Sequence, residues 1–506
     1  MQPVDRHTLA PDVAFDGGDL DCGNGLLLLI RKHIDPLPRG GLLEVRSTEI
    51  SVDEDLPAWC RMTRNELVSW TRHGKQRSFL ICKGALAERD AAAAPRAAAV
   101  RAAGPLPRPQ GEPAPSRPLP PRPLPPLAVT GIGSWPRPRW LIDAMHRHVQ
   151  GQLDEAAFHE AADDAVRLVV GAQQRAGVTL LTDGEQRRDS YASFVATRLD
   201  NCQLVPLTDL LPLVEDPAAF EAEMRALDVP ASEIRHPGVF GRLVRSRPLV
   251  AHELQFLAGI TTAPMKIALP GPYLLTRTMW MDCIADNVYA TREQIAADIV
   301  RVLREELAEL MHAGATLVQL DEPVLSEVVF SGPKNKRSFM CGALSESEGP
   351  EHELGFAKEL VNAVVEGFPR ERIALHVCRG NWTPDESVAL AGSYSPMLST
   401  LAGMRVGAYL LEACTPRAGD MALLKALPAD ARIGVGVVNQ KNPQAEAVDE
   451  VAARIAGAID LFGADRLLLH PDCGFATFAD NPICSAATAE AKLAAIAQAA
   501  RRFGGS

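Results

Sequence analysis

The sequence predicts an α/β protein in which a (β/α)8 TIM barrel with insertions follows a small α/β sandwich domain. Three observations support this fold class. Eight short apolar runs after residue 126 each end on polar or glycine-rich residues, and helical stretches separate most of them. A proline-rich segment precedes these runs, and about 85 residues with their own strand and helix patterns precede that segment. We therefore divide the chain into residues 1–85, 86–126 and 127–506.

The first 85 residues predict the element order β-α-β-α-β. Strands are expected around Val13–Phe15 and within residues 40–46 and 77–82, and helices within residues 26–34 and 57–70. Cys22 falls between the first strand and the first helix. A helix N-terminus favours the thiolate form of a cysteine, so Cys22 is a candidate reactive thiol. The alternative for a single cysteine is an inert, buried side chain.

Residues 86–126 predict a linker. Their first half is rich in alanine, and residues 105–126 contain eleven prolines in 22 positions. Such a segment cannot form the interior of a helix or sheet, and it favours an extended polyproline conformation of ~3.1 Å per residue, about 70 Å in all. It is either an inert spacer or a tether that lets the N-terminal module reach a distant site.

The eight apolar runs of the third part predict the barrel strands. Their ranges are 127–134, 178–185, 265–272, 316–323, 372–378, 407–412, 432–439 and 466–473. The largest insertion is expected at about 192–262, between the second and third strands. In such a barrel the residues just past the strand ends meet at one face. A doubly wound open sheet is the alternative arrangement.

Composition narrows the function classes. The formal net charge is −11, from 52 basic and 63 acidic residues, which argues against nucleic acid or an anionic membrane as a partner. The longest apolar run near the N-terminus, Leu26–Ile30, is too short for a membrane span or signal core, so we expect a cytoplasmic protein. The ten cysteines are expected to be reduced, and those with a function to be metal ligands or reactive thiols.

Four residues of metal-binding type stand at predicted strand ends: His376, Cys378, Glu412 and Cys473. Positions i and i+2 of a strand point to the same side, so His376 and Cys378 can face one ion. Two thiolates, an imidazole and a carboxylate form a reasonable tetrahedral set for Zn²⁺. The alternative for the His-x-Cys pair alone is two structural core residues.

The N-terminal part resembles the TusA-type sulfur-carrier family over about residues 13–84. The resemblance rests on Leu20–Leu26, Ile30–Lys32, Asp55–Cys60 and Asn65–Val68. It implies that Cys22 carries a persulfide, supplied by a sulfurtransferase or cysteine desulfurase. The family's usual Cys-Pro-x-Pro motif reads Cys-Gly-Asn-Gly here, so a degenerate docking module is the alternative.

The third part resembles the catalytic C-terminal half of cobalamin-independent methionine synthase over residues 127–500. The shared motifs are Thr130–Pro136, Asp183–Glu185, Leu269–Pro272, Leu320–Pro323, His376–Cys378, Glu412 and Pro471–Gly474. The resemblance implies a zinc ion on His376, Cys378, Glu412 and Cys473. It also implies that Ser134 and the backbone around Gly133 hold the carboxylate of homocysteine, while Glu185 and Asp321 hold its ammonium group.

The sequence departs from that family in three places. Lys441 occupies the position of a histidine that is thought to deliver a proton toward the leaving folate, and an unperturbed lysine is a poor general acid at neutral pH. Trp280 is the candidate for the tryptophan that stacks on folate, although its spacing is longer. The family's N-terminal barrel is replaced by the sulfur-carrier-like module.

Three functional hypotheses follow. The first is zinc-dependent methylation of homocysteine to methionine, with methyltetrahydrofolate or another methyl donor. The second is a related alkyl transferase or sulfur-handling enzyme in which Cys22 brings sulfur to the zinc site. The third is a non-catalytic, zinc-binding regulator or docking protein.

Overall fold

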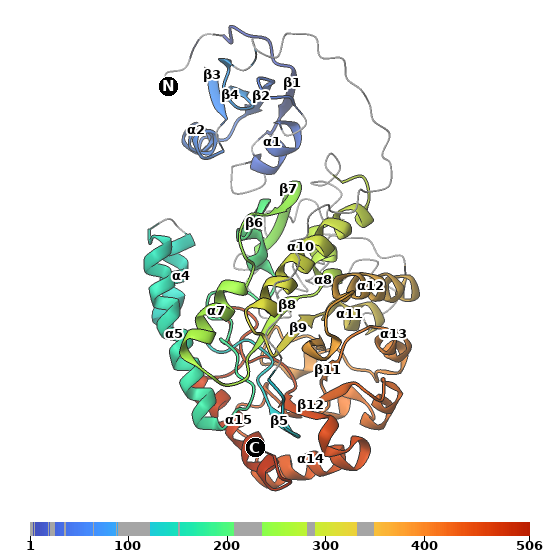
Figure 1. Cartoon of the computed structure of the whole chain (residues 1–506). Helices are drawn as coiled ribbons and strands as arrows, with labels where there is room; N and C mark the ends of the chain where they lie inside the picture. The colour runs from blue at the N-terminus through green and yellow to red at the C-terminus, as the bar shows by residue number, and fades with distance from the viewer. Residues whose placement is uncertain are drawn as a thin grey trace.

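The structure is a computed structural model of the chain (Figure 1). It describes residues 4, 6–18, 20, 26–34, 37–63, 65–87, 89, 122–149, 152–206, 235–280, 289–330 and 349–505. Cys22 and most of the predicted linker lie outside these ranges.

The N-terminal part folds as the expected small α/β domain. Its elements are β1 (Val13–Asp16), α1 (Leu27–Ile34), β2 (Leu42–Ser47), α2 (Val52–Met62), β3 (Glu66–His73) and β4 (Gln76–Cys82). The sheet order is β1-β2-β4-β3, with β1 parallel to β2 and the other pairs antiparallel. Apolar side chains from both helices and the sheet, among them Ile30, Val45 and Phe79, form a separate buried cluster.

One element of this domain differs from the expectation. Residues 66–70, predicted as the end of a helix, lie in the additional strand β3, which pairs with β4. A two-residue turn joins the two strands, and Gly74 in it adopts a positive φ of 66°. Because glycine tolerates that conformation, a tight hairpin is favoured at this position over continuation of the helix.

The third part forms the predicted barrel. Seven parallel strands follow the order β5-β13-β12-β11-β10-β9-β8. Their bounds are β5 Ala128–Val129, β8 Lys266–Pro270, β9 Leu317–Asp321, β10 Ile373–Val377, β11 Ala408–Leu411, β12 Arg432–Val438 and β13 Leu467–Pro471. The eighth position is filled by the predicted second strand, which is reduced to single parallel bridges from Leu180 to Thr130 and from Leu181 to Met265. These two bridges link β5 to β8 and close the barrel.

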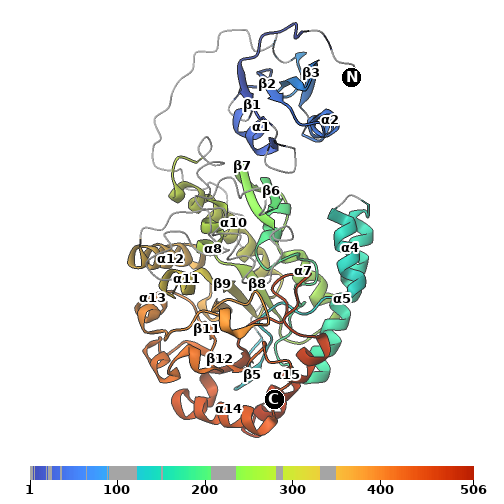
Figure 2. The same cartoon turned by 180° about the vertical axis from the view of Figure 1, so that it is seen from behind.

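Helices surround the strands (Figures 1 and 2). They are α4 (Arg139–Val149), α5 (Glu155–Ala176), α8 (Pro272–Met279), α10 (Arg292–His312), α11 (Val324–Phe330), α12 (Pro350–Val365), α13 (Leu398–Ala402), α14 (Val448–Phe462) and α15 (Ala486–Arg501). Short 3-10 turns occur at Ser193–Thr197, Arg370–Arg372, Glu386–Val388, Ser395–Met397, Pro416–Ala418, Met421–Ala426 and Ala464–Arg466. Local signals define several ends. The Asp154 side chain caps α5 by accepting from the Ala157 N–H, and Gly177 ends it in the left-handed conformation.

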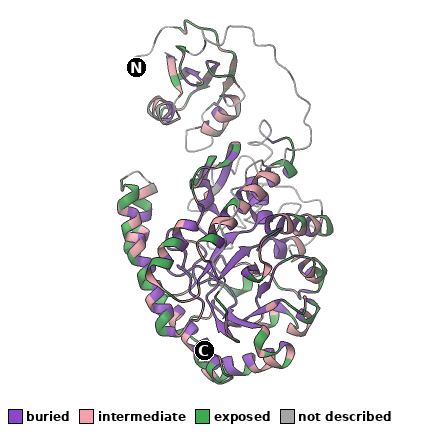
Figure 3. Ribbon diagram, in the orientation of Figure 1, coloured by how far each residue is buried: buried purple, intermediate pink, exposed green. Residues whose placement is uncertain are grey.

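The predicted insertion is present between the second and third strand positions. It contains the antiparallel hairpin of β6 (Leu199–Pro206) and β7 (Arg235–Arg245), followed by α7 (Ala251–Ile260). The barrel strands themselves are almost entirely buried (Figure 3). One apolar cluster lies between strands and helices, and a smaller one that includes Leu180, Ala374 and Leu468 has side chains from several strands. In the described part of the chain, no helix is long and apolar enough to cross a membrane.

Candidate metal centre and substrate pocket

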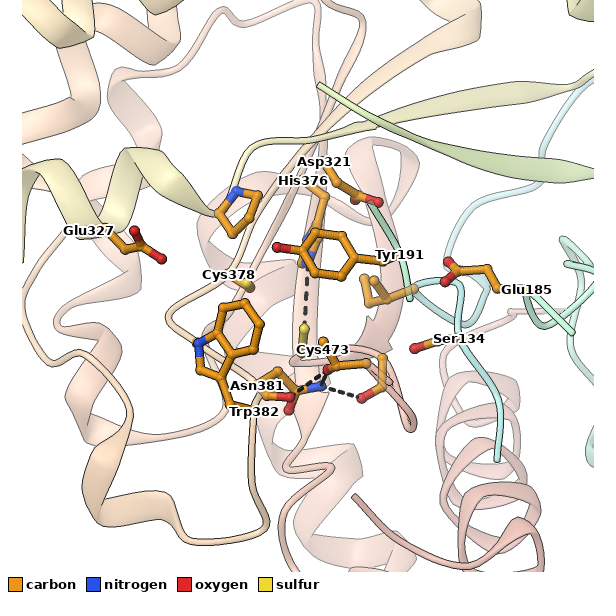
Figure 4. A pocket seen from close by; sticks show the side chains of 15 residues that line it. Ser134, Glu185, Tyr191, Asp321, Glu327, His376, Cys378, Asn381, Trp382 and Cys473 are labelled. Carbon is orange, nitrogen blue, oxygen red and sulfur yellow. Dashed lines mark hydrogen bonds between the residues drawn. The ribbon is translucent and has the colours of Figure 1, made fainter. Parts of the chain in front are cut away.

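Three of the four predicted metal ligands meet at the carboxyl ends of the barrel strands. One donor atom each from His376, Cys378 and Cys473 lies within 4.8 Å of the others, and all three residues are buried. His376 belongs to β10 and Cys378 follows it, while Cys473 follows β13. The Sγ atom of Cys473 is 3.7 Å from Nε2 of His376 (Figure 4). The i, i+2 spacing on β10 thus places both side chains on one face, as predicted.

The surroundings of His376 prepare it to bind a metal. Its Nδ1 atom is 3.0 Å from the carbonyl oxygen of Leu410 on the neighbouring strand. Because a carbonyl oxygen can only accept a hydrogen bond, Nδ1 carries the proton in this contact. Burial lowers the pKa of His376 to about 3, which keeps the imidazole neutral. The free Nε2 electron pair then points to the thiols. Such a backbone contact to the second ring nitrogen is typical of histidine ligands.

The two thiols are close enough to interact with each other. A hydrogen bond to Cys378 and burial both raise the pKa of Cys473 above that of an ordinary thiol. A divalent cation would reverse this effect, because a coordinating thiol is deprotonated. Two thiols and one neutral imidazole, all buried and convergent, fit a zinc ion with one remaining position.

Glu412, the fourth predicted ligand, is buried beyond β11 but has other partners. Its carboxylate accepts a hydrogen bond from the backbone N–H of Arg379 at 2.9 Å and forms an ion pair with the guanidinium of Arg417 at 2.9 Å. It does not belong to the group of three convergent donors. Its role as a ligand therefore stays a prediction that requires the carboxylate to leave Arg417.

A pocket opens directly beside these donors and encloses about 550 Å³, its mouth to solvent included. Three predicted substrate-binding residues, Ser134, Glu185 and Asp321, line it together with the two thiols (Figure 4). The other lining residues are Ile132, Tyr191, Pro323, Glu327, His376, Gly380, Asn381, Trp382, Gly474 and Thr477. The pocket therefore combines a metal-binding end with groups that suit an amino acid.

Gly133 and Glu185 approach each other closely. A Cβ atom on Gly133 would lie 2.0 Å from Oε1 of Glu185, so no other residue fits there without moving the carboxylate. Glu185 itself has a positive φ of 55°, a conformation that is unfavourable for a non-glycine residue and common at functional sites. Burial raises the pKa of Glu185, and a cation bound in the pocket would favour its ionised form.

Asp321 is held by a chain of side chains from the barrel interior. Gln319 donates from Nε2 to Oδ1 of Asp321 at 2.6 Å, and Lys266 donates from Nζ to Oε1 of Gln319 at 2.6 Å. Burial and the charge of Glu185 raise the pKa of Asp321 to about 7. Burial also lowers the pKa of Lys266 to about 7. Each polar group in this chain has a partner, as buried polar groups require.

Ser134 lies next to the segment that carries Cys473. Its Oγ accepts a hydrogen bond from the Ala476 N–H at 3.3 Å, and its carbonyl accepts one from the Phe475 N–H at 3.0 Å. A Cβ atom on Gly474 would lie 2.2 Å from the Ser134 hydroxyl oxygen. The position after Cys473 is therefore occupied by glycine so that the two loops can pack.

Lys441 and Trp280, two further predicted site residues, are not among the residues that line this pocket. Lys441 is buried, and its Nζ donates to the carbonyl oxygens of Thr383 at 2.6 Å and Asp385 at 3.4 Å. Burial lowers its pKa. Trp280 lies half-buried at the end of α8 and packs against the main apolar cluster. Cys22 lies outside the described residues.

Several lining residues were missed from the sequence. Tyr191 and Trp382 contribute aromatic rings, Glu327 a carboxylate, and Asn381 and Thr477 a hydrogen-bonded pair that joins two loops. A signal was available for Trp382, since it follows Cys378 by four positions and stands past the same strand end. Tyr191 comes from a connection whose course the sequence pattern does not indicate. Glu327 lies on α11, and the pattern does not indicate that its side chain reaches the pocket.

A parallel barrel with two thiols and an imidazole convergent at the carboxyl ends of its strands is typical of barrel enzymes, and these three residues form a candidate metal centre beside the pocket. Comparison with known proteins identifies the family. The family described as "Cobalamin-independent synthase, Catalytic domain" matches residues 218–501, more than half of the chain. The chain therefore belongs to the cobalamin-independent synthase catalytic-domain family, as the motifs predicted.

Similar proteins agree with this assignment. The methionine synthase of Sulfurisphaera tokodaii is 28% identical over 349 residues, which cover 69% of this chain and 86% of the relative. That of Sulfolobus acidocaldarius is 26% identical over 349 residues, covering 69% and 85%. A B12-independent methionine synthase structure from Shewanella sp., in complex with selenomethionine, has a TM-score of 0.57 at 22% identity and covers 75% of this chain and 98% of that chain. A putative one from Listeria monocytogenes has a TM-score of 0.53 at 19% identity, covering 76% and 99%. These structures support the fold alone.

Proposed function

We propose that this protein transfers a methyl group to the thiol of homocysteine and so forms methionine. The observation that carries the proposal is the convergence of His376, Cys378 and Cys473 beside a pocket lined by Ser134, Glu185 and Asp321. The first three suit a metal that binds a sulfur substrate, and the last three suit the two charged ends of an amino acid. Membership of the family makes methyl transfer the reaction to expect.

Zinc is the metal that these donors fit. His376, Cys378 and Cys473 would hold it, and Glu412 is proposed as the fourth, exchangeable ligand. When bound, zinc would keep an incoming thiol ionised near neutral pH, which makes its sulfur a nucleophile. The carbonyl oxygen of Leu410 fixes the tautomer of His376, and the surrounding fold buries both thiols.

The residues around the metal centre would orient the acceptor. Glu185 and Asp321 are two buried carboxylates on the same side of the pocket, and an ammonium group between them would compensate both charges. The Ser134 hydroxyl and nearby backbone would bind the carboxylate. With both ends fixed, the side-chain sulfur can reach the thiol end of the pocket. Such positioning is a main contribution of an enzyme to a displacement reaction.

The test is methionine formation by the zinc-loaded, full-length protein from homocysteine and a methyl donor, measured by mass spectrometry. Methionine above the level of a Cys473→Ser control supports the proposal. Full zinc loading without turnover of any thiol would contradict it and favour a non-catalytic, zinc-binding regulator or docking protein.

We further propose that residues 1–85 form a separately folded module, joined through a linker at 86–126 to the barrel of 127–506. Two observations support this division: the small domain has its own buried apolar cluster and its own four-stranded sheet. Cleavage between residues 86 and 126 should release two pieces that each unfold cooperatively. A released N-terminal piece without a cooperative transition would contradict the boundary.

The small domain is also the basis of a second proposal, that Cys22 carries sulfur to the barrel as in a TusA-type carrier. Its support is the α/β fold of the domain, with α1 beginning at Leu27 shortly after Cys22. A sulfurtransferase or cysteine desulfurase would then load Cys22. Cys22→Ser should abolish activity with the physiological acceptor if this is correct. Unchanged turnover of free homocysteine by Cys22→Ser would count against the hypothesis.

A further inference from the structure

Asn381 lines the pocket beside the three convergent donors, and the acceptor amino acid does not explain its presence (Figure 4). It follows Cys378 by three positions and is buried. Its Nδ2 atom donates to the carbonyl oxygen of Gly474 at 2.8 Å and to Oγ1 of Thr477 at 2.9 Å. Its Oδ1 atom accepts from Nε2 of Gln440 at 2.8 Å. Both amide hydrogens therefore bond to neighbouring loops, and neither is free for a substrate.

The partners of this amide belong to loops that follow other strands. Gly474 and Thr477 come after Cys473 and β13, and Gln440 comes after β12. In the sheet, β12 and β11 separate β13 from β10, the strand that leads to Cys378. Three strand spacings of ~4.8 Å measure roughly 14 Å along the sheet. The three donor atoms nevertheless lie within 4.8 Å of one another, so contacts past the strand ends have to bring the two thiols together.

The chain turns between Cys378 and Asn381. Gly380 adopts a positive φ of 94°, a conformation that glycine tolerates better than other residues. Cys378, Gly380 and Asn381 all line the pocket, so this turn keeps the amide beside the thiol that precedes it. One side chain thus ties the loop of Cys378 to the loop of Cys473.

The segment after Cys473 is held from two sides. A Cβ atom on Gly474 would lie 2.2 Å from Oγ of Ser134, and the carbonyl oxygen of Gly474 accepts from Asn381. The hydroxyl of Thr477 also donates to the backbone carbonyl oxygen of Asn381, so the bonds between the loops run in both directions. An asparagine suits this place, because a carboxylate would face the Gly474 carbonyl with an oxygen and a leucine could form none of the side-chain bonds.

We propose that Asn381 is a positioning residue of the metal centre, which holds Cys473 at the distance from Cys378 at which both thiols and His376 can bind one ion. This inference rests on the zinc site of the proposed function and does not depend on the identity of the substrates. Without the amide bonds, the loop after β13 loses its tie to the loop after β10. The donors then have to be ordered when the ion binds, which lowers metal affinity although every ligand is present.

The first test compares zinc affinities of full-length variants by competition with a chromophoric chelator. Asn381→Leu should weaken zinc binding about 10- to 100-fold, the range observed when groups behind metal ligands are removed. Asn481→Leu is the matched control. Asn481 also donates an amide bond between these two loops, to the carbonyl oxygen of Trp382 at 3.0 Å, but it stands eight positions after Cys473. It should leave the affinity unchanged, and equal affinities or equal losses in the two variants would overturn the positioning role.

The second test separates positioning from a general loss of stability. Cobalt(II) is the probe, because its visible absorption depends on the number and geometry of its ligands. Asn381→Leu that is folded by circular dichroism should give a cobalt spectrum with altered intensities, whereas Asn481→Leu should keep the spectrum of the unchanged protein. A substitution that lowers stability alone leaves the spectrum of the folded protein unchanged, and that result for Asn381→Leu would contradict the proposal.

Thr477→Val carries the same test if Asn381→Leu does not fold. It removes the hydroxyl that bonds to Asn381 in both directions, with little change in shape. Zinc affinity should fall about two- to tenfold, as expected for the loss of a hydrogen bond, and an unchanged affinity would overturn the proposal. If the unchanged protein and these variants bind zinc equally, only the role of Asn381 fails. If the unchanged protein binds no zinc, the metal centre of the proposed function fails as well.

Discussion

Lys266 donates a hydrogen bond of 2.6 Å to the amide oxygen of Gln319 in the interior of the barrel. This contact determines which way the Gln319 amide faces, because only its oxygen can accept from an ammonium group. The amide nitrogen is consequently directed to Asp321, to which it donates at 2.6 Å. Two residues that cannot touch the substrate thus orient a carboxylate that lines the pocket, and we regard both as positioning residues.

The pH dependence of acceptor binding should report on this arrangement. The pKa of Asp321 is raised to about 7, so its carboxylate is ionised above pH 7 and protonated below it. An acceptor ammonium needs the ionised form. We expect kcat/KM for homocysteine to rise about tenfold between pH 6 and pH 8. In Gln319→Leu the carboxylate loses a donor that stabilises its charge, so the midpoint should move to higher pH. An unchanged midpoint in Gln319→Leu would contradict the positioning role.

Gly133→Ala should disturb the acceptor end of the pocket. The new Cβ would lie 2.0 Å from Oε1 of Glu185, so the carboxylate has to move. We expect KM for homocysteine to rise about tenfold or more, which corresponds to ~1.4 kcal/mol of lost binding free energy. Gly131→Ala is the matched control, because a Cβ there meets no atom within 4 Å. Equal KM values in the two variants would argue against a role for Glu185 in acceptor binding.

Cys473→Ser should lose most of its bound zinc. The substitution replaces one of three convergent donors and leaves a weaker oxygen ligand. Zinc content measured by inductively coupled plasma mass spectrometry should fall well below one ion per chain. Cys414→Ser offers the control, because Cys414 is a half-buried cysteine close by that does not belong to the group of three. A Cys473→Ser protein that retains one zinc per chain would exclude this ligand assignment.

A buried ion pair should contribute far more to stability than an exposed one. Arg188 contacts Glu253 at 2.7 Å, and both side chains are almost fully buried, whereas the Arg175–Glu490 pair lies at the surface. Glu253→Gln leaves a buried guanidinium without its counter-charge and should lower the free energy of unfolding by about 3–5 kcal/mol. Glu490→Gln should lower it by less than about 1 kcal/mol. Urea unfolding followed by tryptophan fluorescence compares the two, and similar losses would contradict this account.

The sequence could predict those parts of the site that lie on strand ends. His376 lies on β10 and Cys378 directly follows it. Asp321 ends β9, and Ser134, Glu185 and Cys473 follow other strand positions, so the barrel topology brings these residues to one face. Tyr191 and Trp382 stand on connections between strands and helices, and Glu327 lies on α11. The position of such residues depends on how loops pack against each other, for example through the Asn481 bond to Trp382, and local patterns do not encode that.

Residues 66–70 differ from the expectation, and the contacts of Lys441 were not indicated by the sequence. Residues 66–70 read as the end of a helix because apolar residues continue from α2, yet the partner strand β4 and the Gly74 turn favour a hairpin. By the resemblance, Lys441 after β12 occupies the position of a proton-delivering histidine, and a catalytic role for it stays a prediction. In the structure its side-chain nitrogen donates to two carbonyl oxygens of the loop after β10, which satisfies the hydrogen bonds of a buried amine.

The role of Glu412 can be decided by comparing two variants. In the structure the carboxylate pairs with Arg417, whose guanidinium also contacts Glu386. If Glu412 is the exchangeable fourth ligand, Arg417 competes with the metal for it. Glu412→Gln should then weaken zinc binding about 10- to 100-fold, the range seen when groups around a metal site are removed. Arg417→Met should strengthen binding, because the carboxylate loses its competing partner.

The measurement is zinc affinity by competition with a chromophoric chelator at fixed pH. If Glu412 only supports the structure and is not a ligand, the two substitutions should change zinc affinity and stability in a different way. Both substitutions would then break the same buried ion pair, leave one partner uncompensated and lower the free energy of unfolding, and neither would raise the affinity for zinc. Opposite changes in zinc affinity for Glu412→Gln and Arg417→Met would therefore identify Glu412 as a ligand. A loss of stability in both variants, with no gain in zinc affinity, would show that Glu412 only supports the loops that carry Arg379 and Arg417.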